Sequence, residues 1–294
     1  MRYLLERILM YSSVIFLLGI IITIISYYFL KDICSSELCT GTNYRGNKIL
    51  SIGGIHFLFS IFILASVTLI ISNIKTYKGA VSYSLILIII GFAFLGLIDD
   101  LLGNKDSQGF KGHIRSLLHG RLTTGGLKLF GGPIICILAF MPSVHSLGYL
   151  TLICDVIAIS LIANLTNLFD LAPGRSLKIS IVVIIFCLIF STNNEWQYGV
   201  LGILAVLLYF DLKEMLMLGD IGSNSIGAML GFSIVNIVNI NQTYIVIAIA
   251  LVLNLLSEFV SFSLIINKFI PFRILDTFGQ SKERKIWLKK KLSN

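Results

Sequence analysis

Long apolar segments recur along the whole chain, and they constrain its fold more than any other feature. A helix that spans a bilayer needs about 20 mostly apolar residues. Hydrophobic residues make up 56% of the 294 residues and charged residues only 13%, whereas soluble domains are about a quarter charged. The sequence therefore predicts an all-α, polytopic transmembrane helical bundle with about nine spans, at residues 8–30, 53–73, 81–98, 129–147, 149–168, 177–192, 197–211, 223–240 and 244–266.

Lys and Arg residues are unevenly distributed between the two ends of these spans. Most of them follow the first, third, fifth and seventh spans or lie near the C-terminus. Because positively charged loops stay in the cytoplasm, this distribution places the N-terminus outside the plasma membrane and the C-terminus inside. The net charge of +8 then indicates anionic membrane lipids and phosphorylated substrates as partners, and no nucleic acid is expected.

The chain divides into two regions by composition. We expect residues 1–266 to form the transmembrane domain and residues 267–294 to form a basic amphipathic cytoplasmic tail. The tail begins with scattered apolar residues and then carries the basic stretch KERKIWLKKK. Such a segment typically lies in the interface of an anionic membrane, so its Lys and Arg residues need no catalytic role.

The longest polar stretch follows the third span and reads IDDLLGNKDSQGFKGHIRSLLHGRLTTGGLK over residues 98–128. Asp99 and Asp100 end the span, and several cations follow, among them Lys111 and Lys128. Carboxylates are ligands for Mg²⁺, while cations and glycine N–H groups bind phosphate oxygens. The alternative is a solvated loop that only sets topology, but topology does not require two acids at the end of a span.

A second polar segment, NLTNLFDLAPGRSLK over residues 164–178, ends the fifth span. Asn164, Asn167 and Asp170 are spaced i, i+3 and i+6, which predicts that they share one helical face. Arg175 follows the Pro-Gly pair that ends the helix. Polar groups near membrane depth usually face a protein interior or an aqueous cavity. The alternative is helix capping and interhelical hydrogen bonding, which stays open above all for Asn164.

The third polar segment, MLGDIGSNSIG over residues 217–227, precedes the eighth span. Asp220 lies in its Gly-Asp-Ile-Gly-Ser turn. Such a turn can present a carboxylate to a metal while the N-terminus of the next helix faces an anion. The alternative is that Asp220 or Ser223 only caps the eighth helix.

Together, the three segments resemble the polyprenyl-phosphate N-acetylhexosamine-1-phosphate transferases of glycosyltransferase family 4. That family includes phospho-N-acetylmuramoyl-pentapeptide transferase and the enzymes that start teichoic acid and O-antigen synthesis. The Asp-Asp pair, the N-x-x-N-x-x-D segment and the Met-x-Gly-Asp-x-Gly-Ser loop occur in the same order as in that family. The resemblance covers roughly residues 40–265, and by it the chain is identified as a divergent member.

The resemblance implies a function in the synthesis of cell-envelope glycans such as the cell wall. Enzymes of this family transfer a phospho-N-acetylhexosamine from a UDP-sugar to undecaprenyl phosphate or a similar polyprenyl phosphate, release UMP and use Mg²⁺. A homodimer also fits the resemblance, although no stretch of this sequence demonstrates one. The implied roles are catalysis by Asp99, Asp100 and Asp170, metal binding by Asn167 and Asp220, and substrate binding by Lys111, Lys128, Asn164 and Arg175.

The chain departs from the family pattern at three points. The family usually continues its N-x-x-N-x-x-D segment as Gly-x-Asp-Gly-Leu, but residues 171–175 read LAPGR here. A histidine-rich loop and a tenth span, both usual in the family, are also missing from the sequence pattern. The donor sugar and the pathway stay open. So does an alternative function, that of a catalytically inactive relative that binds a lipid-linked sugar or regulates envelope synthesis.

A transporter of lipid or nucleotide is a further interpretation of the same composition. Transporters usually place polar residues near the bilayer midplane, on broken helices in paired repeats. The three polar segments instead gather at one predicted membrane face. This placement favours chemistry at the cytoplasmic surface.

Overall fold

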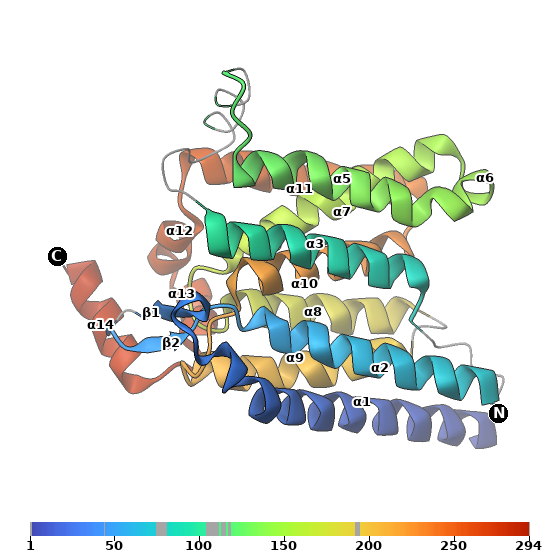
Figure 1. Cartoon of the computed structure of the whole chain (residues 1–294), viewed down its shortest axis with the longest axis horizontal. Helices are drawn as coiled ribbons and strands as arrows, with labels where there is room; N and C mark the ends of the chain where they lie inside the picture. Colours follow the sequence, from blue (N-terminus) through green and yellow to red (C-terminus); the bar gives the residue numbers. More distant parts are fainter. Residues whose placement is uncertain are drawn as a thin grey trace.

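The computed structural model of the chain is a bundle of long helices with short elements gathered at one end (Figure 1). The structure describes residues 2–43, 45–74, 81–103, 112, 116, 119–191 and 195–293. The helices of the bundle are α1 (Arg2–Leu30), α2 (Gly54–Ile74), α3 (Tyr83–Leu102), α5 (Thr124–Phe140), α7 (Tyr149–Phe169), α8 (Arg175–Phe190), α9 (Trp196–Leu212), α10 (Gly219–Val235) and α11 (Ile240–Phe259).

Shorter elements connect or flank these helices. Strands β1 and β2 form an antiparallel hairpin in which Gly41 lies opposite Ile49. The 3₁₀ turns are Ile33–Ser35, Glu37–Cys39 and Met141–Ser143. The remaining short elements are β1 (Thr40–Thr42), β2 (Lys48–Leu50), α6 (Val144–Leu147), α12 (Phe262–Lys268), α13 (Ile270–Thr277) and α14 (Lys282–Ser293).

The prediction of an all-α polytopic membrane protein is confirmed. Each of the predicted spans overlaps a described helix or helix pair, and several boundaries differ by a few residues. Six of the described segments are long and apolar enough to cross a membrane, from α1, α2, α3, α5 with α6, α7 and α11. Helices α8, α9 and α10 have 16, 17 and 17 residues and lie among the longer ones (Figure 1).

Helix α10 is the central helix of the bundle and is buried along most of its length. It packs against α7, α3, α2 and α8. Small residues allow this close approach, as is common between membrane helices. A Cβ atom at Gly227 would lie 2.7 Å from Cα of Ala163, and one at Gly231 would lie 2.8 Å from Cα of Ile159. Helix α10 is therefore fixed by its neighbours on several sides.

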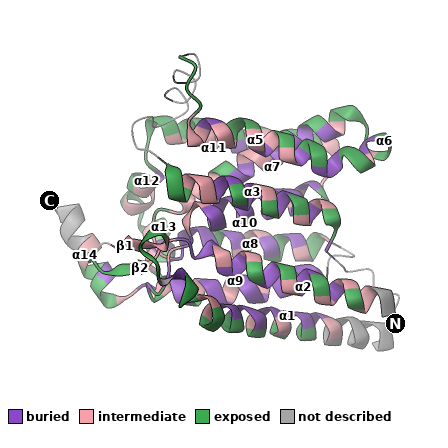
Figure 2. Cartoon of the chain, viewed as in Figure 1, coloured by how far each residue is buried: buried purple, intermediate pink, exposed green. Residues whose placement is uncertain are grey.

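Buried residues face the inside of the bundle (Figure 2). Many large apolar side chains are exposed on its outer surface. Large side chains such as Phe94, Val182 and Ile189 are exposed on it. An apolar outer surface of this kind is suited to lipid. The helices are suited to it as well, because they satisfy their own backbone hydrogen bonds. The burial pattern therefore agrees with a membrane environment.

The polar segments meet at one end of the bundle, opposite the N-terminus of α1 (Figure 1). Helices α3, α7 and α9 end there, and α5, α8 and α10 begin there. Backbone hydrogen bonds hold the segment after β2 against the α9–α10 connection: Met217 N–H donates to Leu50 O, and Gly53 N–H donates to Met217 O. This end of the molecule carries the candidate site.

The C-terminal segment folds back onto the same end of the bundle as α12, α13 and α14 (Figure 1). Asp276 of α13 is buried, while most of the apolar side chains of this helix are exposed. The exposed ones include Ile270, Phe272, Ile274 and Leu275. Helix α13 is thus amphipathic, with its polar side turned toward the protein and its apolar side turned outward.

Candidate active site

The carboxylate of Asp100 caps the N-terminus of α10. Its two oxygens accept the backbone N–H groups of Asp220 at 3.0 Å and of Ile221 at 2.9 Å. Gly219, just before them, has φ of +71°, and a Cβ atom there would lie 2.3 Å from Ser51 O. The last turn of α3 is therefore tied to the first turn of α10 by an N-cap interaction, and Asp220 does not cap its own helix.

Lys128 of α5 lies between two carboxylates from other helices. Its Nζ atom donates to Asp99 Oδ2 at 2.5 Å and also forms an ion pair with Asp220 Oδ2. Thr123 caps the start of α5 by accepting the N–H of Gly126, which fixes the turn that carries Lys128. Residues of α3, α5 and α10 thus meet at one ammonium group. Charge-assisted contacts of this kind are the stronger hydrogen bonds in proteins.

Asn167, in the last turn of α7, joins this cluster. Its Nδ2 atom lies 3.3 Å from Asp220 Oδ2, and its Oδ1 atom accepts the hydroxyl of Ser223 at 2.8 Å. Asp99, Lys128, Asn167 and Asp220 thus come from four helices and form one polar cluster, which we call the acid–lysine cluster.

The acid–lysine cluster has the ligand types of a divalent cation site. The described residues hold no group of three or more His, Cys, Asp and Glu side chains placed to bind a metal. The carboxylates of Asp99 and Asp220 nevertheless share one positive charge, that of Lys128, and the amide of Asn167 contacts the same Asp220 oxygen. Carboxylate and amide oxygens are the ligands that Mg²⁺ takes. The carboxylates of Asp99 and Asp220 and the Oδ1 of Asn167 are of these types, although the Asn167 atom that contacts Asp220 is its Nδ2 donor.

Asp170 follows the last residue of α7 and faces α8 instead of the acid–lysine cluster. The hydroxyl of Ser176 donates to Asp170 Oδ1 at 2.6 Å. Burial raises the pKa of the Asp170 carboxyl from 3.8 to about 6, and the nearby charge of Asp100 adds to the rise. A carboxyl with such a pKa changes its charge near neutral pH, which is common at functional sites.

Asn164, Asn167 and Asp170 do not converge, contrary to the expectation that they share one face. Asn164 Nδ2 donates to Asn254 Oδ1 of α11 at 2.6 Å, and Asn254 in turn donates to Leu161 O. Asn167 contacts α10, and Asp170 contacts α8. The helix ends at Phe169, so Asp170 no longer follows the helical periodicity. Asn164 makes the interhelical bond that was its alternative interpretation.

Arg175 is buried and binds the C-terminal segment. Its Nε and Nη2 atoms donate to the Asp276 carboxylate at 2.7 and 3.0 Å, and its Nη1 atom donates to Ser263 Oγ at 2.8 Å. Its guanidinium nitrogens are therefore engaged within the protein. Lys111, the other cation expected to bind substrate, lies outside the described residues.

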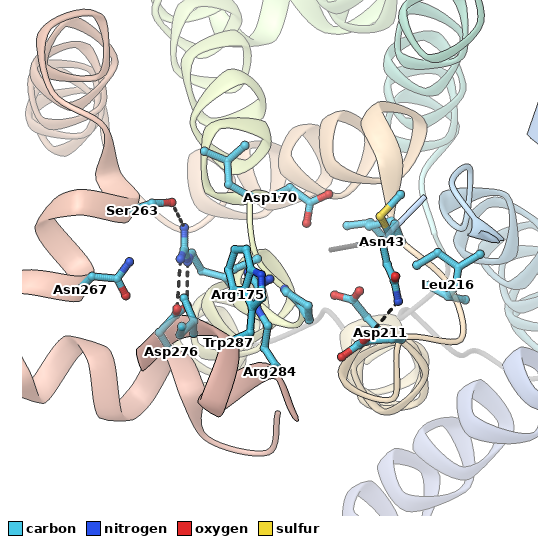
Figure 3. A pocket seen from close by; sticks show the side chains of 18 of the residues that line it. Asn43, Asp170, Arg175, Asp211, Leu216, Ser263, Asn267, Asp276, Arg284 and Trp287 are labelled. Atoms are coloured by element: carbon cyan, nitrogen blue, oxygen red, sulfur yellow. Dashed lines mark hydrogen bonds and ion pairs between the residues drawn. The ribbon is translucent and has the colours of Figure 1, made fainter. Parts of the chain in front are cut away.

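A cavity of about 560 Å³ lies beside Asp170, between the hairpin, the α7–α8 turn and the C-terminal segment. Figure 3 shows Arg175, Asp276, Arg284 and Trp287 on one side of it and Asn43, Asp211 and Leu216 on the other. Asn267 also lines the cavity, and its buried Oδ1 atom has no hydrogen-bond partner among the described residues. A buried acceptor without a partner among the described residues thus lies in the wall of the cavity.

Several cavity residues were not singled out from the sequence. Glu214, with φ of +57°, accepts hydrogen bonds from Asn43, Arg45 and Ser281. Asp211 accepts the N–H of Gly174 at 2.6 Å. The sequence offers one signal for these residues, an acid at the end of an apolar segment. Of Glu214 and Asp211, only Asp211 has it. The tail was expected only at the membrane, whereas its Arg284 and Trp287 reach the cavity wall.

Fold and site together define a class of protein. It is a polytopic membrane protein that gathers two carboxylates, an ammonium group and an amide at helix ends, at the same end of the bundle as the cavity. The sequence model of glycosyl transferase family 4 matches residues 82–238, which is more than half of the chain. The chain belongs to glycosyl transferase family 4. No curated protein matches the chain.

Family membership makes the protein an enzyme of the phosphoglycosyl transferase kind. Members of this family transfer phospho-sugars to polyprenyl phosphate, generally from nucleotide-sugars and with a divalent metal. The matched range contains the whole acid–lysine cluster together with Asp100 and Asp170, and it ends before α11. The C-terminal segment that closes the cavity lies outside this range.

Proposed function

We propose that the protein catalyses the Mg²⁺-dependent transfer of a phospho-N-acetylhexosamine from a UDP-sugar to a polyprenyl phosphate such as undecaprenyl phosphate, with release of UMP. One observation carries this proposal. Within the family-matched range, Lys128 bridges Asp99 and Asp220, and Asn167 contacts the same Asp220 oxygen. Residues from four helices thus build a site for negatively charged groups and a cation.

The transfer joins two anions, and charge repulsion opposes it. An oxygen of the lipid phosphate attacks the sugar-linked phosphorus of the donor, a new P–O bond forms, and the bond to UMP breaks. Lys128 neutralises the phosphate oxygens as negative charge builds up on them. Asp99, held 2.5 Å from Lys128, orients the lipid phosphate and takes its proton if it arrives protonated. Asp100 acts through the backbone, because it fixes the turn that carries Asp220.

Asp220 and Asn167 would hold the divalent cation. When bound, Mg²⁺ supplies positive charge that polarises phosphate oxygens and stabilises the leaving group. Asp220 offers a carboxylate that is half-buried, and Ser223 holds the side chain of Asn167 in place through a 2.8 Å hydrogen bond. Metal ligands are usually fixed by such neighbouring hydrogen bonds.

The cavity beside Asp170 is proposed to receive the nucleotide. Its volume of about 560 Å³ falls in the range of about 300–1,000 Å³ that small-molecule sites occupy. Two of its charged groups, Arg175 and Asp276, neutralise each other, and Glu214 pairs with Arg45. The buried Oδ1 of Asn267 therefore stands out as an acceptor for the N–H of a nucleobase.

The apolar surface of the bundle and the distribution of Lys and Arg residues support a proposed membrane placement. The apolar bundle lies in the bilayer, and the site lies at the cytoplasmic face of the plasma membrane, where Lys and Arg residues concentrate. The apolar side of α13 and the exposed Lys282 and Lys285 of α14 would then contact the anionic headgroup region. In this placement the ends of α3 and α10 would face the headgroup region that holds the lipid phosphate.

The test uses the purified protein in detergent with undecaprenyl phosphate, Mg²⁺ and a panel of UDP-sugars. UMP release that needs both the lipid and the metal, and that is lost in Asp220→Asn, supports the proposal and identifies the donor. Glu283→Gln, which removes an exposed acid of α14, serves as the control. Nucleotide binding without UMP release for every donor would contradict the proposal and indicate an inactive relative.

A further inference from the structure

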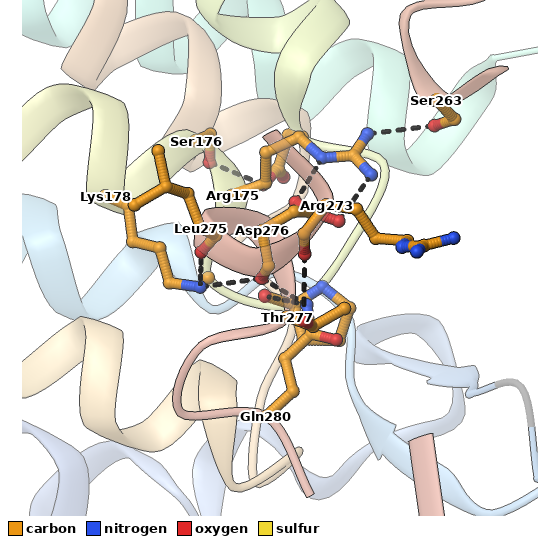
Figure 4. A network of polar contacts seen from close by, with 12 residues as sticks. Arg175, Ser176, Lys178, Ser263, Arg273, Leu275, Asp276, Thr277 and Gln280 are labelled. Atoms are coloured by element: carbon orange, nitrogen blue, oxygen red, sulfur yellow. Dashed lines mark hydrogen bonds and ion pairs between the residues drawn. The ribbon is translucent and has the colours of Figure 1, made fainter. Parts of the chain in front are cut away.

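The α7–α8 turn, residues 170–176, is held from outside the family-matched range. Arg175 makes a two-pronged ion pair with Asp276 of α13 and a third bond to Ser263 of α12 (Figure 4). Both partners of the ion pair are buried, with side chains 6% and 4% exposed. Paired N–H groups from one guanidinium fix geometry as well as charge. The ion pair therefore sets both the position and the orientation of the turn.

Further contacts join the same two segments. Lys178, one turn along α8, donates to the backbone carbonyls of Leu275, Asp276 and Phe278 at 3.1, 2.7 and 2.7 Å. These carbonyls belong to the C-terminal end of α13, where a cation is favourable. Gln280 Nε2 donates to Pro173 O at 3.0 Å, so the C-terminal segment also holds the middle of the turn.

The opposite side of the turn is anchored to the bundle. Gly174 N–H donates to Asp211 of α9 at 2.6 Å. The φ of Gly174 is +74°, and a Cβ there would lie 2.7 Å from a side-chain atom of Leu212. The turn therefore needs glycine at this position. Ser176, next to Arg175, holds the Asp170 carboxylate at 2.6 Å. Asp170 is thus linked to Asp276 through two adjacent residues.

We propose that Asp276 is a positioning residue: through Arg175 it holds the turn 170–176, and with it Asp170 and one wall of the cavity, in the form that binds the donor. The identity of the ligand rests on the proposed function, whereas the bracing of the turn does not. Arg175 stands within this turn and reaches the C-terminal segment through Asp276 and Ser263.

The main alternative is that the ion pair only attaches the C-terminal segment to the bundle. The two possibilities differ in which segment loosens when Asp276 is replaced. Bracing predicts that the turn 170–176 loosens when the pair is broken. Simple attachment predicts that only α12–α14 loosen.

The experiment compares Asp276→Asn, Asp276→Glu and Glu283→Gln in the full-length protein. Hydrogen–deuterium exchange is followed in peptides that cover residues 170–176 and, as a folding control, in peptides from α10. For Asp276→Asn we expect faster exchange in the turn, no change in α10, and a rise of about tenfold in KM for the nucleotide-sugar with kcat within about threefold. Asp276→Glu keeps the charge and is expected to recover most of the difference. Glu283→Gln is expected to match the unmodified protein.

A second variant guards against misfolding of Asp276→Asn. Arg175→Lys keeps the positive charge but loses the planar fork, and it is expected to loosen the turn in the same way. Unchanged exchange at 170–176 in both variants would overturn the proposal, as would a loosened turn with unchanged donor binding, measured with UMP by calorimetry. Absence of turnover in the unmodified protein would count against the proposed function alone, because exchange and UMP binding do not depend on turnover.

Discussion

Asp100 and Asp220, separated by 120 positions in the chain, are joined by a hydrogen bond of 3.0 Å from the backbone N–H of Asp220 to the carboxylate of Asp100. The acid that ends α3 therefore caps the helix that carries the second carboxylate of the acid–lysine cluster. This contact gives the two adjacent acids different tasks. Asp99 faces Lys128, and Asp100 fixes the start of α10.

Replacing Asp100 tests this division of tasks. Asp100→Ala removes the cap of α10, and losing such a cap costs about 0.5–2 kcal/mol of stability. We expect a lower thermal midpoint together with a large loss of UMP release, because Asp220 shifts. Asn239→Ala is the matched control, since Asn239 caps α11 through a capping box at the opposite end of the bundle. The control should lower the midpoint by a similar amount and leave turnover intact. Equal turnover in both variants would contradict a role for Asp100 in placing Asp220.

Lys128 is predicted to be needed for turnover and to compete with a divalent cation for the two carboxylates. Lys128→Met removes the ammonium group between Asp99 and Asp220. Loss of one such electrostatic group typically lowers kcat about 10²–10³-fold. With its positive charge gone, the carboxylates should hold Mg²⁺ more tightly. A thermal-shift titration with MgCl₂ should therefore reach half-saturation at a lower concentration in the variant. A higher half-saturation concentration would show that Lys128 assists metal binding instead.

The raised pKa of Asp170 predicts a pH effect on stability with a defined sign. The folded carboxyl titrates at about 6 and the reference value is 3.8, so between these values the unfolded chain binds fewer protons. Stability from this group therefore falls as pH rises from about 4 to 6 and stays lower above that window. Asp170→Asn cannot ionise and should unfold at a higher temperature than the unmodified protein at pH 7.5. The difference should vanish below about pH 4. A difference that grows toward low pH would contradict the assignment.

Much of the fold was predictable from the sequence, because a membrane span is a local property of about 20 residues. The meeting of Asp99, Lys128, Asn167 and Asp220 was also within reach, since each lies at a helix end on the same predicted side. The divergence of Asn164 and Asp170 was not, because it depends on α7 ending at Phe169. The pair of Arg175 with Asp276 spans 101 positions and leaves no local signal in either segment.

The helix start at Gly219 shows another limit of sequence analysis. The eighth span was predicted from residue 223, shortly before the apolar run that starts at Ile226, but α10 starts at Gly219 and carries Asp220 in its first turn. Hydrophobicity marks the part of a helix that meets apolar surroundings, whereas the cap from Asp100 extends α10 into polar residues. Nothing near Asp220 in the sequence indicates a capping group 120 positions away.

The most direct test of phospho-sugar transfer is mass spectrometry of the lipid product. The unmodified protein and Asp220→Asn are incubated with a UDP-N-acetylhexosamine, undecaprenyl phosphate and Mg²⁺, and the lipid fraction is analysed. A new species with the mass of undecaprenyl diphosphate N-acetylhexosamine, formed by the unmodified protein and absent for Asp220→Asn, is the result we predict. The same yield from Asp220→Asn, or no such lipid with any UDP-sugar, would contradict the transfer reaction at the acid–lysine cluster.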